Sequence, residues 1–543
     1  MNYDVVFLHP PAIFDFRDKP YFPGPIAYTV INESTDQFII PPVGLLSIAE
    51  YLDRHGYKVI VDNIGERMLL EESFDVKKYL SKINARVFGI DLHWCIHIHG
   101  SINLAKTCKE LHPNSLIVLG GLTATRFHDE IIQKFNFIDV VIRGEAEEPF
   151  LKLMESIDKY DNVRDVPNAT HRANNKVRLE PQVPPVDNLN KYEFSRLDLL
   201  QPKSLLFSTT RPPFHPHWSI PICRGCIYNC KTCGGSAYFY KKYFGRTRPA
   251  PRSPEKIVED LEKLSEQKVN TVFLFQDPRI CGKKFYEELF NTLKREGIPV
   301  DHLTLELFFP ANEEYIGKIS KLGVSTTLTI SPESGSEDIR KIHGRKYSNE
   351  QLFRTIKICQ KYHIPLLVFF MLPLAYENNE SIKETWDIWE KICVMDEEAR
   401  DEKNPLTVGY GFGQMILMDP GSLAFDMPQD HGYRLVYRTL EEHLYGLSLP
   451  SWHQWINYET TYFDRKSIAD LILDSLEYSI DLRERYGIYN RLDAFYERFL
   501  FVNLSRLVIK EIDEIMQIKD AERNEKLQNL YIKVRQMMLG VKK

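Results

Sequence analysis

Short apolar runs alternate with amphipathic stretches over the first 155 residues. The runs have the length of buried strands, and the stretches between them repeat apolar positions every three or four residues, as helices do. Strands that alternate with helices predict a doubly wound parallel sheet, which binds its ligands at the carboxyl ends of the strands. The predicted strands are Tyr3–Leu8, Lys58–Asp62, Val87–Asp91, Ser115–Leu119 and Val140–Arg143, with helices over Pro42–Leu52 and Ile102–Leu111.

A second alternation of the same kind covers residues 201–425. Ser253-Pro254-Glu255 is typical of a helix start, with a Ser N-cap, a Pro in the first turn and an acidic residue beside it. Six strand–helix repeats predict a partial (β/α)6, TIM-like barrel, whose reactive centre lies at the carboxyl ends of its strands. The strand-like runs are Ser219–Ile222, Thr271–Phe275, Leu303–Phe309, Ser325–Ile330, Pro365–Leu372 and Gln414–Met418, with helices including Lys283–Arg295 and Asn349–Tyr362.

The remaining segments differ in pattern from these two. Residues 156–200 are polar and rich in proline, which predicts a linker, and residues 426–543 have the spacing of amphipathic helices. We therefore expect an α/β protein with an N-terminal domain over 1–155, a linker over 156–200, a barrel over 201–425 and a mostly helical C-terminal domain over 426–543. The aromatic stretch at 450–458 either packs as a cluster or lines a substrate cavity.

Composition narrows the class of protein. A hydrophobic share of 43% and a charged share of 27% are ordinary for soluble globular domains. The net charge of −6 gives no electrostatic footprint for nucleic acid, and no apolar run of about twenty residues predicts a transmembrane segment. Nine cysteines with no secretory signal argue against disulfides. We expect a cytoplasmic protein that does not bind nucleic acid.

Three thiols stand close together in the run Cys226-Ile-Tyr-Asn-Cys230-Lys-Thr-Cys233. Soft thiolates select zinc or iron–sulfur centres, and closed sites of either kind take four protein ligands. A set of three leaves one position for an exogenous ligand. The alternative is a zinc knuckle with Cys223 as fourth ligand, but no partner pair with zinc-ligand spacing follows closely. We expect Cys223 to be a buried neighbour of the site.

This C-x3-C-x2-C spacing resembles that of the radical S-adenosylmethionine (SAM) enzymes. The resemblance implies a [4Fe-4S] cluster held by Cys226, Cys230 and Cys233, with SAM on the open iron. It also implies a reductant such as flavodoxin or ferredoxin, and cleavage of SAM to a 5′-deoxyadenosyl radical.

The N-terminal segment resembles the cobalamin-binding domain found upstream of many radical SAM enzymes. It shares with that domain Pro-Pro after the first strand, Pro-x-Gly-Leu at Pro42, Gly-Gly after the fourth strand and Arg-Gly-Glu after the fifth. The general alternative is a nucleotide-binding Rossmann unit. The resemblance implies cobalamin contacts from the loops at the carboxyl ends, namely Gly120, Gly121, Thr123, Gly144 and Glu145.

One motif departs from the cobalamin domains that ligate cobalt by histidine. Asp91-Leu-His93 looks like the start of their Asp-x-His-x-x-Gly loop, yet it follows the third strand, and residue 96 is Ile. We therefore expect cobalamin without that histidine ligand. His93 and Trp94 either face the corrin ring or belong to a loop that only packs. His97 and His99 are expected to be ordinary surface or packing histidines rather than metal ligands.

Residues at the strand ends of the barrel suggest contacts to SAM. Asp277 stands where related enzymes often have Gly-Gly-Glu, and Glu333-Ser334 resembles a Gly-Ile-Glu-Ser pattern near the SAM ribose. Leu372–Glu377 occupies the place of a Gly-x-Pro-x-Glu-Thr motif that packs against adenine. Glu306, within the third strand, points into the barrel or is a paired structural carboxylate.

The resemblance implies a cobalamin-dependent radical SAM C-methyltransferase, in which methylcobalamin supplies the methyl group. A cobalamin-bearing enzyme that cyclises or rearranges without methyl transfer is the enzymatic alternative, and a cobalamin- or zinc-binding sensor is the non-enzymatic one. A small metabolite, a lipid and a peptide stay open as substrates, and no catalytic side chain is assigned.

Overall fold

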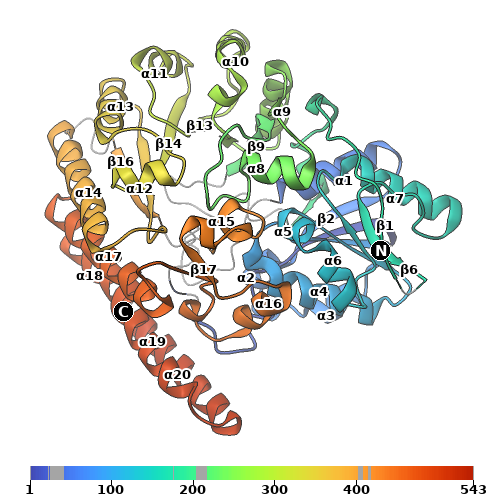
Figure 1. Cartoon of the computed structure of the whole chain (residues 1–543). Helices are drawn as coiled ribbons and strands as arrows, with labels where there is room; N and C mark the ends of the chain where they lie inside the picture. The colour runs from blue at the N-terminus through green and yellow to red at the C-terminus, as the bar shows by residue number, and fades with distance from the viewer. Residues whose placement is uncertain are drawn as a thin grey trace.

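The computed structural model describes residues 2–22, 24, 42–174, 176–202, 217–400, 408–413 and 417–541. Two parallel sheets dominate the molecule (Figure 1). The N-terminal sheet and its helices lie on the right of Figure 1, the second sheet and its helices form the top and left, and the last helices run down the lower left. The α/β prediction, with a doubly wound domain, a six-stranded barrel and a helical C-terminal part, is confirmed.

The N-terminal sheet has the strand order β7-β6-β5-β4-β3-β1-β2-β8. Its central strands pair in parallel, so the carboxyl ends of β1, β3, β4 and β5 meet at one edge. The strands are β1 (Asn2–His9), β2 (Val59–Asn63), β3 (Asn84–Asp91), β4 (Leu116–Gly120), β5 (Val140–Ile142), β6 (Ala169–Ala173), β7 (Lys176–Leu179) and β8 (Leu200–Gln201). The helices are α1 (Val43–Arg54), α2 (Ile64–Leu70), α3 (Val76–Leu80), α4 (Ile98–Leu111), α5 (Leu122–Arg126), α6 (His128–Lys134) and α7 (Glu147–Tyr160).

The segment after α7 contributes three strands to this sheet. β6 pairs antiparallel with β5, β7 pairs with β6, and β8 extends the opposite edge beside β2. The segment predicted as a linker therefore adds strands at both edges of the sheet, and the domain boundaries at 155 and 200 stay predictions.

The second sheet has the order β16-β15-β14-β13-β12-β9, and all its neighbouring strands are parallel. Burial alternates along β13 and β15, so one face packs on helices and the other faces the inside of the partial barrel. The strands are β9 (His217–Pro221), β12 (Thr271–Phe275), β13 (His302–Leu307), β14 (Ser325–Glu333), β15 (Leu366–Met371) and β16 (Val408–Gly413). The helices are α8 (Ala237–Phe239), α9 (Pro254–Glu266), α10 (Lys283–Glu296), α11 (Glu313–Ile319), α12 (Glu337–Ile342), α13 (Asn349–Lys361) and α14 (Asn379–Ala399).

The predicted position of the sixth strand was wrong. β16 lies at Val408–Gly413, ahead of the predicted Gln414–Met418, of which 414–416 lie outside the described residues and Leu417 and Met418 are not in a strand. Every second residue of β16 is glycine, which is depleted from strands. The apolar run that follows β16 looks more like a strand in the sequence.

The C-terminal part covers both sheets. α16 packs beside α4 of the N-terminal domain, and α17 packs along α14 of the barrel. In Figure 1, α20 projects beyond the rest of the molecule. The elements are α15 (Leu423–Asp426), β17 (Tyr433–Leu435), α16 (Leu440–Ser448), β18 (Tyr458–Thr460), α17 (Arg465–Arg485), α18 (Arg491–Glu497), α19 (Leu504–Ile515) and α20 (Asp520–Val541).

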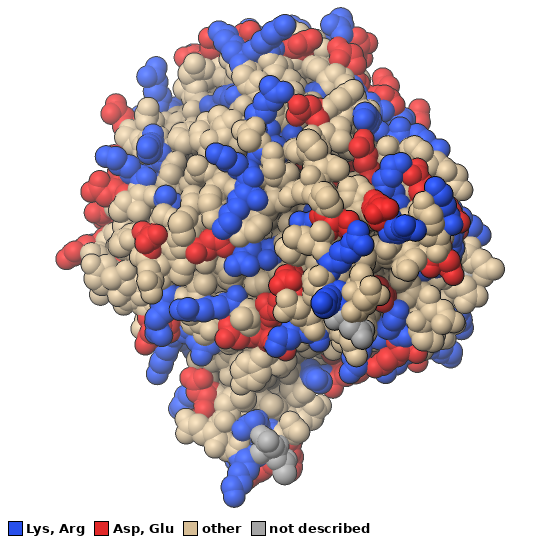
Figure 2. Space-filling view, turned by 45° about the vertical axis from the view of Figure 1, so that its right-hand side comes forward, with Lys and Arg blue, Asp and Glu red and all other residues tan. Residues whose placement is uncertain are grey.

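Charged side chains of both signs are interspersed over the face shown in Figure 2. Among the residues that the structure describes, no helix combines the length and the hydropathy that a membrane-spanning segment requires.

Candidate cofactor sites

The three cysteines lie on the loop between β10 (Cys223–Arg224) and α8. β10 pairs antiparallel with β11 (Ala250–Pro251), which fixes the start of the loop. Cys230 is buried, Cys226 is partly exposed and Cys233 is exposed. Cys223 is fully buried, and its thiol donates to Gln276 Oε1 at 2.8 Å. Cys223 is thus held beside the loop by a partner of its own, as a neighbour of the predicted ligands would be.

Main-chain amides of the loop point at two of the sulfur atoms. Tyr228 N donates to Cys226 Sγ at 3.4 Å and Gly235 N donates to Cys233 Sγ at 3.3 Å. Burial raises the pKa of Cys230 to about 11, and it also raises the pKa of Cys226. Hydrogen bonds to sulfur are a normal means of tuning iron–sulfur centres, so this donor set fits a thiolate-bound cluster. Among the described residues, no three His, Cys, Asp or Glu side chains are placed to hold a single metal ion.

An ion pair lies near the cysteine loop at the end of β14. Arg345 Nε is 3.1 Å from Glu333 Oε1, and Arg345 Nη1 donates to the Phe308 carbonyl at 2.8 Å. Burial raises the pKa of Glu333, and Arg345 opposes that rise. Within the described chain, Glu333 Oε2 is buried without a hydrogen-bond partner. A carboxylate oxygen with spare capacity beside a cation suits a zwitterionic ligand such as the amino-acid end of SAM.

Asp277 is occupied by contacts within the protein. Its carboxylate accepts from Arg279 Nη2 and from Phe308 N, each at 2.7 Å, and it is 2% exposed. The structure thus shows Asp277 tying the ends of β12 and β13 together. Its predicted contact to SAM stays a prediction.

Glu306 lies on the inward face of β13. Its Oε2 accepts from Gln276 N at 2.5 Å, and Gln276 has a φ of +83°. Burial raises the pKa of Glu306 to about 7. Both interpretations of the sequence therefore hold in part: the carboxylate faces the barrel interior, and it also stabilises a turn whose backbone conformation is unfavourable for a residue other than glycine.

The Ser334 hydroxyl is hydrogen-bonded within the protein. Its hydroxyl donates to Glu377 Oε1 at 2.7 Å, and Leu374 N donates to Glu377 Oε2 at 2.7 Å. These bonds connect the end of β14 to the Leu372–Glu377 turn, and both Ser334 and Glu377 are fully buried. The predicted contact of Ser334 with SAM stays a prediction.

The glycine loop after β4 crosses the loop after β3 at close range. Gly121 has a φ of +114°, and a Cβ there would lie 2.7 Å from the His93 backbone. Thr123 N and Oγ1 both donate to the His93 carbonyl, at 3.1 and 2.9 Å. Gly144 N donates to Thr125 Oγ1 at 3.0 Å, which joins the loop after β5 to the same group. The predicted cobalamin residues are therefore brought together at one edge.

The Asp91 carboxylate is directed toward His9 rather than His93. His9 Nδ1 lies 2.9 Å from Asp91 Oδ2. The His93 ring instead packs edge-on against Trp94, with centroids 4.7 Å apart, and burial lowers its pKa. His97 and His99 are buried, as expected for packing residues, and His99 Nδ1 accepts from Phe14 N at 3.0 Å.

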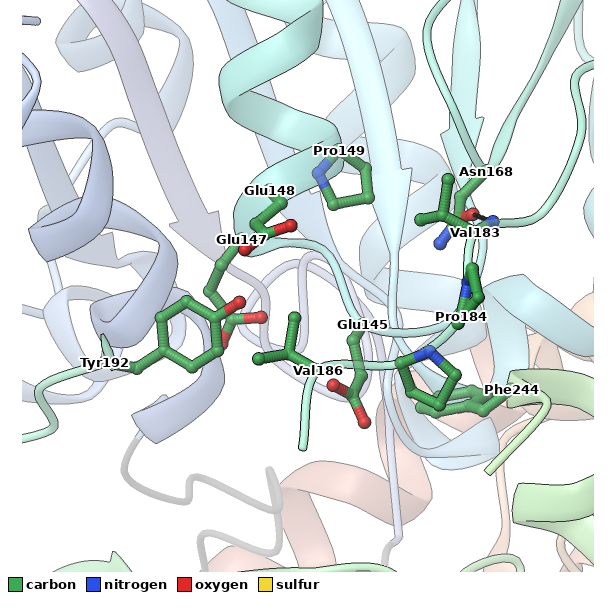
Figure 3. A pocket seen from close by; sticks show the side chains of 11 residues that line it. Glu145, Glu147, Glu148, Pro149, Asn168, Val183, Pro184, Val186, Tyr192 and Phe244 are labelled. Atoms are coloured by element: carbon green, nitrogen blue, oxygen red, sulfur yellow. Dashed lines mark hydrogen bonds between the residues drawn. The ribbon is translucent and has the colours of Figure 1, made fainter. Parts of the chain in front are cut away.

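Glu145 lines a pocket where the two domains meet (Figure 3). Figure 3 shows Glu147 and Glu148 near Tyr192, with Val186 between them and Glu145, which lies toward Phe244. Glu145 Oε1 accepts from Arg246 Nε at 2.8 Å, and Glu145 Oε2 is 3.6 Å from Arg224 Nη1. The carboxylate is thus engaged by the barrel domain.

The aromatic stretch at 450–458 packs as a cluster. Trp452 and Trp455 are almost fully buried, and Trp455 Nε1 donates to the Leu449 carbonyl at 2.9 Å. Asn457 ties the stretch to Met418 by two hydrogen bonds of 2.9 Å.

Sequence reasoning missed the arginines of these sites. Arg224, Arg246 and Arg345 each meet a glutamate, and two of these pairings cross from one domain to the other. The only local signal was the position of Arg224 between two cysteines.

Two family models match the chain. The radical SAM superfamily model matches residues 220–387, and the B12 binding domain model matches residues 30–154. The first range contains the cysteine loop and β12 to β15, and the second ends just after the Gly144 loop.

Several curated relatives are similar over half of the chain or more. An uncharacterised methyltransferase of Pyrococcus horikoshii is 25% identical over 65% of this chain and 74% of its own. The hopanoid C-3 methylase of Methylococcus capsulatus is 27% identical over 51% of this chain and 49% of its own. An anaerobic magnesium-protoporphyrin IX monomethyl ester cyclase of Rubrivivax gelatinosus is 24% identical over 64% of this chain and 61% of its own.

Several solved structures share the fold. The cobalamin-dependent SAM radical enzyme OxsB, with aqua-cobalamin and SAM bound, aligns with a TM-score of 0.58 at 13% identity, over 99% of this chain and 79% of its own. The radical SAM methyltransferase TsrM of Kitasatospora setae, with cobalamin and a [4Fe-4S] cluster bound, aligns with a TM-score of 0.55 at 15% identity, over 80% and 77%.

Proposed function

We propose that this chain, which belongs to the radical SAM enzymes that carry a B12-binding domain, transfers a methyl group to a carbon atom of its substrate. Its cofactors are a [4Fe-4S] cluster, SAM and cobalamin. Two of the three curated relatives named above are a methyltransferase and a methylase.

The observation that carries the proposal is the contact between the two predicted cofactor loops. Arg224, between Cys223 and Cys226, reaches Glu147 beside the Gly144 loop, with Nη1 to Oε2 at 3.0 Å. A substrate bound between these loops would face both cofactors, which is the arrangement that hydrogen abstraction followed by methyl delivery requires.

When bound, the cluster and SAM supply a carbon-centred radical, and the cobalamin supplies the methyl group. The residues of the chain would position the cofactors and shield them from solvent. Cys226, Cys230 and Cys233 would hold the cluster, and Glu333 and Arg345 would orient the charged end of SAM. The glycine loops would admit the corrin ring.

Asp426 of α15 pairs with Arg126 of α5 at 3.1 Å. Ala424 N of α15 donates to the Lys231 carbonyl of the cysteine loop at 2.8 Å, so α15 would help to shield the region between the two loops from water.

Methyl-labelled SAM tests the reaction. The reconstituted enzyme is incubated with SAM, a reductant and a metabolite extract of a strain that lacks the gene, and the products are separated by mass spectrometry. The proposal expects label in one new product. Accumulation of 5′-deoxyadenosine and an altered product without label would contradict methyl transfer.

A cyclisation without methyl transfer is the second candidate, because the Rubrivivax gelatinosus cyclase is similar over 64% of this chain. It predicts a product that has lost hydrogen and carries no label. We further propose a ferredoxin- or flavodoxin-type reductant, which the resemblance to radical SAM enzymes implies. We also propose a cytoplasmic location, because the cysteines are not expected to form disulfides.

A further inference from the structure

Four charged residues join the loops that carry the two predicted cofactor sites. Arg224 meets Glu147, with Nη1 to Oε2 at 3.0 Å, and lies 3.6 Å from Glu145. Arg246 lies 2.6 Å from Glu145. We call Glu145, Glu147, Arg224 and Arg246 the interdomain ion cluster. Its glutamates belong to the N-terminal domain and its arginines to the barrel.

The interdomain ion cluster is buried and electrically balanced. The side chains of Arg246 and Glu147 are 1% and 2% exposed, and those of Glu145 and Arg224 are 9% and 17% exposed. Burial alone would raise the pKa of Glu147, but Arg224 holds it below its usual range, so the carboxylate is ionised at neutral pH. Buried charges of this kind are stable only in a well-defined geometry.

On the barrel side, the arginines are fixed against the cysteine loop. Gly225, between Arg224 and Cys226, has a φ of +103°, and a Cβ there would lie 2.9 Å from Arg246 Cδ. Arg246 also donates from Nη2 to the Val186 carbonyl at 2.7 Å. The backbone that leads into Cys226 therefore packs directly on the stem of Arg246.

On the N-terminal side, the glutamates are fixed to the sheet. Ser47 Oγ of α1 donates to Glu147 Oε1 at 2.7 Å. Glu145 directly follows Gly144, whose amide is held by Thr125 of the glycine loop. A shift of either loop would thus be transmitted to the other through the ion cluster.

We infer that the interdomain ion cluster is a positioning device that sets the spacing between the iron–sulfur cluster and the cobalamin. The inference rests on the proposed cofactor sites, and it concerns spacing rather than the fate of the methyl group. Its four residues are positioning residues, because they act through the two loops.

Distance between the cofactors is the direct test. The holoenzyme is loaded with cob(II)alamin and a reduced [4Fe-4S] cluster, and the magnetic interaction between the two centres is measured by electron paramagnetic resonance. The wild-type protein is expected to give one narrow distance distribution. Glu147→Ala and Arg246→Gln should broaden it at least twofold while iron and cobalamin contents stay unchanged.

Asp260→Asn is the matched control. Asp260 and Arg252 form a pair 2.5 Å apart, with both side chains 0% exposed, that includes none of the four residues of the ion cluster. This variant should lower the thermal midpoint without changing the distance distribution. Should Glu147→Ala and Arg246→Gln fail to fold, Glu147→Gln, which keeps the shape and one acceptor, replaces them.

A distribution identical to wild type in these variants, or one broadened equally by Asp260→Asn, would overturn the inference. The outcome is separable from that of the labelling experiment. If the labelling experiment contradicted methyl transfer while the variants still broadened the distance distribution, the positioning role would be retained.

Discussion

Arg345 and Glu333 form an ion pair of 3.1 Å that uses only one oxygen of the carboxylate. The other oxygen, Glu333 Oε2, is buried and makes no hydrogen bond within the described residues. A buried acceptor without a donor costs free energy, and a bound ammonium group would remove that cost. This relationship gives the SAM site its most specific prediction.

Glu333→Gln is expected to weaken SAM binding about 10- to 100-fold, because a hydrogen bond to a charged group contributes roughly 1.5–3 kcal/mol. Binding is measured by calorimetry on the reconstituted enzyme. Asp338→Asn, which removes an exposed carboxylate of neighbouring α12, should leave the affinity unchanged. Equal affinities of wild type and Glu333→Gln would exclude Glu333 from the SAM site.

Gly121→Ala is expected to impair cobalamin binding. The φ of +114° is unfavourable for alanine, and the new Cβ would press on the His93 backbone at 2.7 Å. Backbone strain of this kind costs roughly 1–3 kcal/mol. An absorbance titration with hydroxocobalamin measures the affinity.

Gly297→Ala supplies the matched glycine control. Gly297 follows α10 of the barrel, its φ of +81° is likewise unfavourable for alanine, and beyond its chain neighbours no atom of the described residues lies within 4 Å of the position of its Cβ. Alanine there should lower stability by roughly 1–3 kcal/mol and leave cobalamin affinity unchanged. If Gly121→Ala bound cobalamin as tightly as Gly297→Ala, the glycine loop would not be part of the site.

Single alanine substitutions of Cys226, Cys230 and Cys233 should each abolish the cluster. Iron content and the absorbance of the reconstituted protein should fall to background, and SAM cleavage should fall at least about 100-fold, because a [4Fe-4S] cluster needs its thiolates. Cys223→Ala is the control, since Cys223 is buried and bonded to Gln276. A zinc site with four thiolates would instead lose its metal in the Cys223→Ala variant as well.

The sequence was sufficient for much of the architecture because periodicity is local. Val5 to Leu8 form a buried strand whose apolar run is visible in the sequence, and Ser253 accepts from Lys256 N as the N-cap of α9. The sixth strand was misplaced because its glycines hide its β-structure.

The candidate sites depend more on contacts between distant residues. The cysteine spacing lies within eight residues and could be recognised directly. The partners of Glu147 and Glu145, by contrast, are 77 and 101 residues away, and no pattern along the chain links them. Likewise, the turn of Ser334 toward Glu377 follows from packing across 43 residues.

Glu377 should make stability fall as pH rises. Burial raises its pKa to about 8, so the folded protein retains this proton over a range in which the unfolded chain, with a pKa near 4.5, has lost it. The folded state binds more protons between these values, and its stability therefore decreases from about pH 4.5 to about pH 8, by roughly 1.4 kcal/mol per unit at most. Glu377→Gln, which cannot ionise, should gain thermal midpoint relative to wild type as pH rises from 5 to 8. The exposed Glu350→Gln should follow wild type over the same range, and a constant offset between Glu377→Gln and wild type would show that Glu377 ionises normally in the folded state.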